Sequence, residues 1–385
     1  MSNCTAILNA TLIDGTGRPP LPESVVVIRS GWFEAVGQAG EVAVPGDVET
    51  IDAAGRYLIP GLFDCHMHIG GGPYRAIKTL RDTLAMGVTT VAHVGGFRAG
   101  AEVAALRDAI EQGLVGPCSR LVAGAVVAAT AGHVMGRTAD GPWEVRKAVR
   151  EQRVANIDFI KTAASGGFWA EHEECWWRDY TYEELEALVD EAHAVGKPVA
   201  VHAHTQPGLN NAIRAGADMI HHGAFIDDEA LRGIAERNIF FIPTLRVTSE
   251  RNIAIKEQAG RPWEARKMRE AHPIHREGVR KARALGIRIG VGTDLPSTPP
   301  WRAGQTAVEL LELAACGFSP METIIAATRT SAECLGKAHE LGTIEPGKRA
   351  DLILLDADPL ANLSILTEER HIRMVMKDGE VAIRR

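Results

Sequence analysis

The sequence lacks the usual features of exported, membrane-bound and nucleic-acid-binding proteins. Its six cysteines show no C-x-x-C spacing, which favours free buried thiols over a disulfide framework or a thiolate zinc site. No apolar run is long enough to cross a membrane, and residues 1–8 contain no basic n-region and no cleavage site. With 42 basic and 49 acidic residues, the chain has no basic tract for nucleic acid or an anionic membrane. These absences favour a cytoplasmic protein whose partners are small molecules.

From residue 57 to about residue 341, strand-like apolar runs alternate with amphipathic helical stretches. Strands are predicted near residues 58–66, 88–94, 120–128, 157–163, 198–204, 218–223, 239–245 and 287–293. Helical patterns such as 75–86, 101–111, 182–195 and 227–236 lie between them, with glycines at the helix ends, at Gly87, Gly196 and Gly216. Repeated strand–helix order with eight strands predicts an α/β fold, the parallel (β/α)8 TIM barrel.

The two ends of the chain differ from this middle part. Residues 5–56 and roughly 343–385 carry short alternating or apolar strands, for example 24–29 and 373–377, broken by glycine turns. Each end alone is too small to bury a core. We therefore expect residues 1–56 and 343–385 to form one small β-sandwich domain, and residues 57–342 to form the barrel.

A pair of histidines, His66 and His68, follows the apolar run 57–63. Because side chains alternate along a strand, both histidines should project the same way as a metal chelate, with Cys65 on the opposite face. Later strands end in further metal-competent side chains, at Lys161, His202, His204, His221, His222 and Asp294. In a closed parallel barrel the carboxyl ends of the strands meet at one mouth, so these side chains should gather there.

These motifs resemble those of the amidohydrolase superfamily, and within it the prolidase-related metal-dependent hydrolases, which include Xaa-Pro dipeptidases and N-acyl amino acid and amide hydrolases. The matching segments are spread over almost the whole chain, at residues 60–68, 159–161, 165–167, 201–204, 222–223, 292–294 and 342–352. The resemblance also implies a barrel with a β-sandwich split across the termini.

The resemblance implies two divalent metal ions. The ligands of the more buried ion would be His66, His68 and Asp294, and those of the other ion His202 and His222. A carboxylated Lys161 would bridge the two ions. An unmodified ammonium, with an intrinsic pKa of about 10.4, would repel the ions, whereas a carbamate offers two anionic oxygens. Zinc suits these donors best, although manganese, cobalt or iron would also fit. Strand alternation leaves the choice between His221 and His222 even; the resemblance selects His222.

The implied reaction is hydrolysis of an amide C–N bond in a peptidic or N-acyl amino acid-like substrate. A metal-bridging hydroxide would attack the carbonyl, with Asp294 as general base and then general acid. One alternative is a hydrolase of a cyclic or xenobiotic aromatic amide. Another is a heterocycle aminohydrolase, but such deaminases usually carry a glutamate three residues after a fifth-strand histidine, where this chain has Thr205 and Pro207. A non-catalytic scaffold is disfavoured because every expected ligand is present.

Four residues are candidates for substrate contact. His133 resembles a Gly-His element near the substrate in these hydrolases, and His204 is either a hydrogen-bond donor to the substrate carbonyl or a packed barrel histidine. Arg246 is the candidate partner of a substrate carboxylate, at a place where prolidase relatives often have a tyrosine. Trp169 either walls a pocket for an apolar group or packs its loop or an oligomer interface. We also expect a homo-oligomer.

Overall fold

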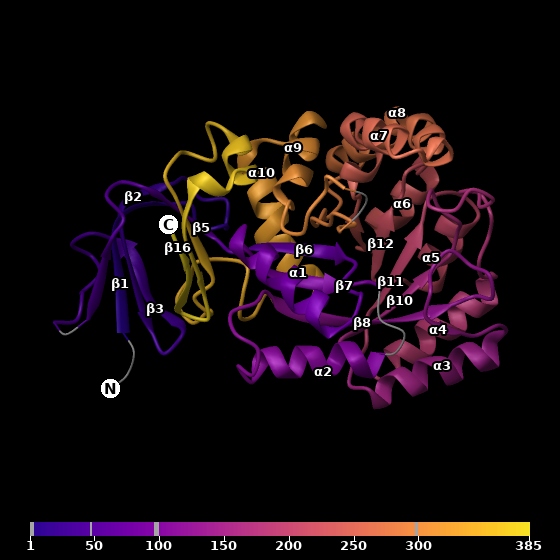
Figure 1. Cartoon of the computed structure of the whole chain (residues 1–385), viewed down its shortest axis with the longest axis horizontal. Helices are drawn as coiled ribbons and strands as arrows, with labels where there is room; N and C mark the ends of the chain where they lie inside the picture. The colour runs from indigo at the N-terminus through magenta and orange to yellow at the C-terminus, as the bar shows by residue number, and fades with distance from the viewer. Residues whose placement is uncertain (1–3, 47, 96–99, 297–298) are drawn as a thin grey trace.

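The computed structural model describes residues 4–46, 48–95, 100–296 and 299–385. It has two parts, a β-sheet built from both ends of the chain and a barrel with its helices (Figure 1). In Figure 1 the indigo and yellow strands of the two termini lie side by side, which confirms that the ends of the chain pair with each other. No helix in the described part of the chain is both long and apolar enough to cross a membrane.

The barrel sheet runs in sequence order with parallel neighbours, which confirms the predicted fold class. Its strands are β6 (Leu62–Met67), β7 (Val88–His93), β8 (Arg120–Ala128), β10 (Phe159–Ala163), β11 (Val199–Ala203), β12 (Met219–His222) and β13 (Phe240–Ile242), with the short β9 (Arg137–Thr138) beside β8. The predicted strand 287–293 is not continuous. Backbone hydrogen bonds from Phe241 N to Arg288 O, 3.0 Å, and from Cys65 N to Val291 O, 2.7 Å, nevertheless join this segment to both neighbours and close the barrel.

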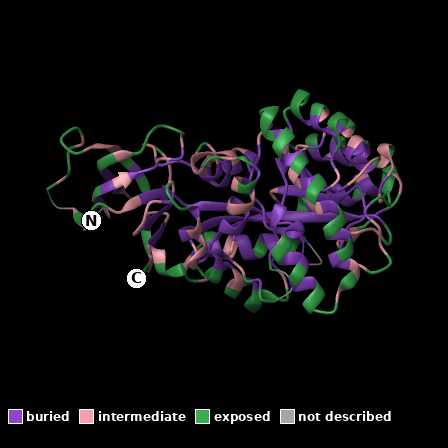
Figure 2. Ribbon diagram, turned by 90° about the horizontal axis from the view of Figure 1, so that it is seen from above, coloured by how far each residue is buried: buried purple, intermediate pink, exposed green. Residues whose placement is uncertain are grey.

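Helices surround the barrel, and Figure 2 shows their outer faces exposed around buried strands. They begin and end at local signals: Thr181 and Glu184 form a capping box, and Gly216 ends its helix with φ 91°. The helices between the strands are α1 (Pro73–Ala85), α2 (Gly100–Glu111), α3 (Pro142–Val154), α4 (Tyr182–His193), α5 (Gly208–Ala215) and α6 (Asp228–Glu236).

A helical segment follows β13 and lies at the top of Figure 1. It consists of η1 (Leu245–Thr248), α7 (Glu250–Gln258) and α8 (Pro262–Ala284). The chain then passes through the barrel-closing residues to α9 (Ala307–Ala315), α10 (Pro320–Ile325), η2 (Ala326–Thr330) and α11 (Ser331–Cys334).

The terminal sheet has the order β16-β15-β14-β5-β1-β2-β3, with β4 beside β1. Its apolar face buries side chains from both ends of the chain, among them Ile7, Phe33, Leu352 and Met374. The strands are β1 (Cys4–Leu12), β2 (Leu21–Arg29), β3 (Trp32–Gln38), β4 (Glu49–Asp52), β5 (Tyr57–Pro60), β14 (Leu352–Leu355), β15 (Ile372–Lys377) and β16 (Glu380–Arg384), and the short η3 (Leu363–Thr367) and η4 (Glu369–His371) precede β15.

The predicted strand 58–66 is in fact two strands. Residues Tyr57–Pro60 form β5 of the terminal sheet, and the chain enters the barrel only after Gly61. A Cβ at Gly61 would lie 2.3 Å from Oγ1 of Thr89, so only glycine fits where the chain passes β7. The exact division of the chain into domains at residues 56 and 343 stays a prediction.

The prediction for Cys65 was wrong. Its side chain belongs to the same buried apolar cluster as Phe159, Ala200 and Ile242, which come from other barrel strands, so Cys65 faces the barrel interior. The register between β6 and β7 shifts between Asp64 and Met67. This irregularity interrupts the alternation on which the prediction relied.

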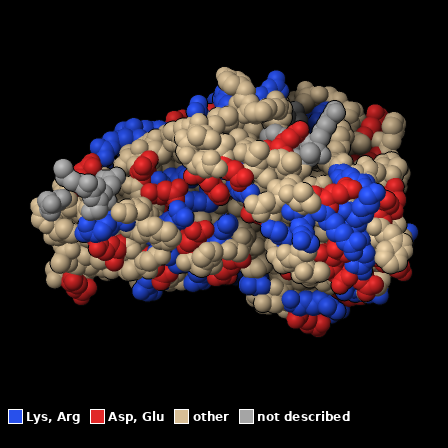
Figure 3. All heavy atoms as spheres, turned by 90° about the horizontal axis from the view of Figure 1, so that it is seen from below, with Lys and Arg blue, Asp and Glu red and all other residues tan. Residues whose placement is uncertain are grey.

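The surface carries charges of both signs. On the face drawn in Figure 3, basic and acidic side chains are interspersed. This pattern agrees with the absence of a basic tract from the sequence.

Candidate active site

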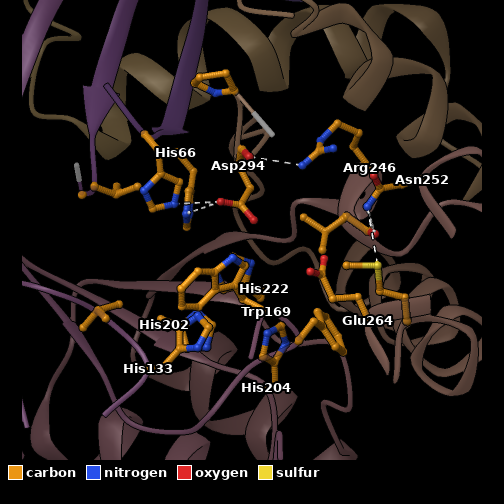
Figure 4. Close-up of a pocket in the computed structure, with 18 of the residues that line it drawn as sticks. His66, His133, Trp169, His202, His204, His222, Arg246, Asn252, Glu264 and Asp294 are labelled. Atoms are coloured by element: carbon orange, nitrogen blue, oxygen red, sulfur yellow. Dashed lines mark hydrogen bonds and ion pairs between the residues drawn. The ribbon is translucent and has the colours of Figure 1, made fainter. Parts of the chain in front are cut away.

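A cavity of about 390 Å³ opens at the carboxyl ends of the barrel strands. Figure 4 shows histidines and Asp294 on one part of its wall and Arg246 and Asn252 on another. Every residue predicted for the site lines this cavity: His66, His68, His133, Lys161, Trp169, His202, His204, His222, Arg246 and Asp294. The fold thus brings together side chains that are far apart in the sequence.

One possible ligand group for a metal ion consists of His66, His68 and Asp294. Nε2 of His68 lies 2.8 Å, and Nε2 of His66 3.5 Å, from Oδ1 of Asp294. Burial lowers the pKa of His66 to about 4, so its imidazole is neutral. Burial alone would raise the pKa of Asp294, but hydrogen bonds from both histidines outweigh burial and hold the pKa well below its usual value. Neutral imidazole and ionised carboxylate are the forms that bind metal.

A second group consists of His202, His204 and His222. The ring centroids of His202 and His222 lie 4.4 Å apart, and those of His204 and His222 4.9 Å apart. Burial lowers the pKa of all three well below the usual value, so these rings are also neutral. Nδ1 of His222 forms a hydrogen bond with Oγ1 of Thr244 at 2.7 Å, and this bond directs Nε2 of His222 away from Thr244. The two ligands that the sequence suggested here, His202 and His222, thus lie together, with His204 beside them.

Lys161 is 1% exposed and lies in the wall of the same cavity. Burial lowers the pKa of its amine to about 7. Burial is also the main cause of the low pKa of His66 and His202, and the charge of Lys161 lowers both further. Lys161 is therefore within electrostatic reach of both histidine groups.

The adjacent His221 and His222 both face inward, contrary to the alternation argument. Nδ1 of His221 lies 2.6 Å from Nδ1 of His66, and His222 lines the cavity. The cause is the backbone of His222, whose φ of 74° is in the left-handed region and ends the strand alternation. His221 thus supports His66 from behind, whereas His222 reaches the cavity.

Sequence reasoning missed two carboxylates behind the cavity wall. Asp64 accepts hydrogen bonds from Oγ1 of Thr293, 2.6 Å, and Oγ1 of Thr306, 2.9 Å. It so ties the segment of His66 and His68 to the segment of Asp294, and burial raises its pKa to about 6. Glu309 accepts from the backbone N of Leu245, 2.6 Å, and of Arg246, 2.8 Å, and burial raises its pKa to about 8. Asp64 could have been noticed two residues before His66, but no local signal marks Glu309.

Arg246 is fully buried beside this wall. Its Nε donates to Thr293 O at 2.6 Å and one Nη to Asp294 O at 3.2 Å, while Nη1 has no hydrogen-bond partner among the described residues. Lys256 and Arg261 also line the cavity and pair with Glu264 at 2.7 Å and 2.5 Å. This wall therefore has three positive charges and one negative charge, which favours an anionic substrate group.

The rim of the cavity is apolar. Phe168 lies 4.4 Å from His204 between ring centroids, and Trp169 is 57% exposed at the opening. The carbonyl of Trp169 accepts a hydrogen bond from Nε1 of Trp263 at 3.1 Å, so this residue both lines the cavity and packs its loop on α8. Trp176 and Trp177 are exposed and do not line the cavity.

A comparison with known protein families agrees with the barrel, the two histidine groups and the buried lysine. The profile described as the Amidohydrolase family matches residues 57–382. The chain belongs to the amidohydrolase family and is an enzyme that acts on amide bonds.

Individual relatives differ in what they act on. The chain is 29% identical to an ochratoxinase of Aspergillus niger, over 98% of this chain and 86% of the relative. It is 25% identical to an imidazolonepropionase of Rhizobium rhizogenes, over 90% of each. Among solved structures, an Xaa-Pro dipeptidase with methionine bound in its active site superposes with a TM-score of 0.88 at 28% identity, covering 98% of this chain and 99% of the other.

Proposed function

We propose that this enzyme hydrolyses the amide C–N bond of a peptidic or N-acyl amino acid-like substrate that carries a free carboxylate. The observation that carries the proposal is the arrangement of the cavity walls. Possible donors for two metal ions lie on one wall, and Arg246, whose buried Nη1 has no partner among the residues described, lines the next. An amide carbonyl and a carboxylate in one small substrate would match these two walls.

Two divalent ions fit the donors, with zinc as the first choice. His66, His68 and Asp294 would hold one ion, His202 and His222 the other, and carboxylated Lys161 would bridge them. The neutral imidazoles, the ionised Asp294 and the weakly basic Lys161 support this assignment. When bound, such ions supply Lewis-acid polarisation and lower the pKa of water towards about 7.

The side chains of the chain itself then have separate tasks. The ionised Asp294 would accept the proton of the attacking water at its carboxylate and pass it to the leaving nitrogen as the C–N bond breaks. His133 and His204 offer hydrogen bonds to the substrate carbonyl, and His204 has a buried Nδ1 that lacks a partner within the described ranges. Arg246 holds the carboxylate, and Trp169 covers the apolar part of the substrate.

A second candidate is hydrolysis of a cyclic or xenobiotic aromatic amide. The apolar rim formed by Phe168, Trp169 and Met135 supports it, and so does the similarity to an ochratoxinase. Deamination of a heterocycle is less well supported, because the glutamate that such deaminases carry after the fifth-strand histidine is missing. Thr205 in this region cannot replace it as a base, since its Oγ1 donates to Cys175 O at 2.8 Å.

A substrate screen tests the proposal. Purified metal-loaded enzyme is incubated with dipeptides, N-acyl amino acids, lactams and aminated heterocycles, each acid beside its carboxamide, and amine and ammonia are detected separately. We expect an amine from the free acids. Ammonia released only from a heterocycle would overturn the proposal, and equal cleavage of acids and carboxamides would favour the second candidate.

A further inference from the structure

His133 is held from several sides on the cavity wall. Its Nδ1 lies 2.7 Å from Oε1 of Glu173, and its backbone N donates to Oδ2 of Asp179 at 2.8 Å. Its ring stacks on His202 with centroids 4.1 Å apart and an angle of 23°. Within the described chain, Nε2 has no hydrogen-bond partner, so it is the ring nitrogen left for a ligand in the cavity.

Two glycines make room for this arrangement. A Cβ at Gly167 would lie 2.2 Å from Cε1 of His133, and a Cβ at Gly132 would lie 2.9 Å from Oδ2 of Asp179. Any larger residue at Gly167 would displace the ring. The close packing of backbone against imidazole fixes the plane of the ring, but the plane alone does not decide which nitrogen faces the cavity.

Glu173 makes that choice, and it is itself held firmly. Its Oε1 also accepts from the backbone N of Gly167 at 2.9 Å. Nζ of Lys267, a lysine of α8 that is 1% exposed, donates to Ala170 O at 2.8 Å and also to the carbonyl of Glu173. The loop that carries Glu173 is therefore anchored to α8, which also provides part of the cavity wall.

We propose that Glu173 is a positioning residue for His133. By accepting the Nδ1 hydrogen, its carboxylate fixes the tautomer and orientation in which Nε2 points at the substrate, as an outer carboxylate does for a metal-bound or catalytic histidine. Lys267 acts one step further out, by holding the backbone of Glu173. The proposal rests on the proposed function only in that His133 touches the substrate.

A double-mutant cycle tests whether Glu173 acts through His133. Glu173→Ala is expected to lower kcat by roughly 10- to 100-fold, the usual loss when such an outer partner is removed, with a smaller change in KM and unchanged metal content. His133→Ala should lose at least as much. If Glu173 works only through His133, adding Glu173→Ala to His133→Ala should cause no further loss. A similar further loss in that background would overturn the proposal.

Glu174→Gln is the matched control. Glu174 is the next residue on the loop, but its Oε1 pairs with Arg266 at 3.1 Å, away from His133, so kcat and KM should stay near wild type. Should the screen find no cleaved amide, the proposed function fails, and crystals of Glu173→Ala decide this inference. An imidazole at residue 133 that is displaced, or whose two ring nitrogens have exchanged places, supports positioning, and an imidazole that keeps both its place and the orientation of its nitrogens overturns it.

Discussion

Replacing Arg246 with methionine should separate substrate recognition from structure. If the buried Nη1 pairs with a substrate carboxylate, Arg246→Met breaks a desolvated charge pair. Such a loss costs roughly 2–4 kcal/mol, or about 30- to 900-fold in kcat/KM. This loss of the charge pair should be confined to substrates that have a free carboxylate.

The structure adds a second loss that every substrate shares. Arg246 also donates to the carbonyls of Thr293 and Asp294, at 2.6 and 3.2 Å. Each hydrogen bond contributes roughly 0.5–1.5 kcal/mol, so the two together contribute roughly 1–3 kcal/mol. Because these bonds hold the backbone beside the proposed base, a carboxamide substrate should also be cleaved more slowly, by that smaller amount.

The difference between matched substrates therefore isolates the carboxylate contact. The assay measures kcat/KM for one acid and its carboxamide with wild type, Arg246→Met and Arg246→Lys, at metal contents shown to be equal by elemental analysis. We expect the acid-to-amide ratio to fall by about 30- to 900-fold in the methionine variant. Equal losses on both substrates would refute the reasoning, and the Trp169 side of the cavity would then be the place to examine.

Three further predictions concern the metal ligands. Elemental analysis after dialysis against metal-free buffer should find two divalent ions per chain, and a constant maximum of one ion with full activity would contradict the two-metal proposal. His66→Ala should abolish turnover. Lys161→Ala should lose activity and regain part of it with a short carboxylic acid, and an unmodified Lys161 far from metal in an active crystal would refute its bridging role. His222→Ala should be inactive at any metal concentration. His221→Ala, which removes a hydrogen bond to His66, should weaken metal binding by about 10- to 100-fold and recover activity in excess metal; the reverse result would show that the roles of the two histidines are exchanged.

The barrel and the histidines, lysine and aspartate that line its cavity could be predicted because each depends on a short local pattern. A β-rich apolar run that ends in His202 or Asp294 carries its own information, since the carboxyl ends of parallel strands must meet. The same reasoning failed where two apolar strands follow each other without a turn between them. Residues 57–66 read as one strand, although Gly61 divides them between two sheets, and nothing in an apolar run marks the point of division.

Alternation failed at Cys65 and His221 for a related reason. It assumes regular strands, but β6 is irregular between Asp64 and Met67, and His222 adopts φ 74°. Thr244 and Asp294, at the ends of the next two barrel segments, also have left-handed backbones, with φ 52° and 61°. Such conformations cost free energy in non-glycine residues and concentrate at functional sites. Strand periodicity is thus least dependable at the strand ends that form the cavity.

The partners that position Arg246 and His133 could not be predicted in the same way. Arg246 is positioned by Glu309, more than 60 residues later, and His133 by Glu173, 40 residues later. Neither pair has a spacing that follows from helix or strand geometry; each joins residues that only the folded chain brings together. The proposed metal ligands lie at the ends of the barrel strands, whereas Arg246 and Trp169, two proposed substrate contacts, lie in the segment from η1 to α8 and in the loop packed on it. A sequence of this kind therefore specifies the reaction class more clearly than the substrate, and variants in α8, such as Lys267→Met, should alter specificity while leaving the metal ligands in place.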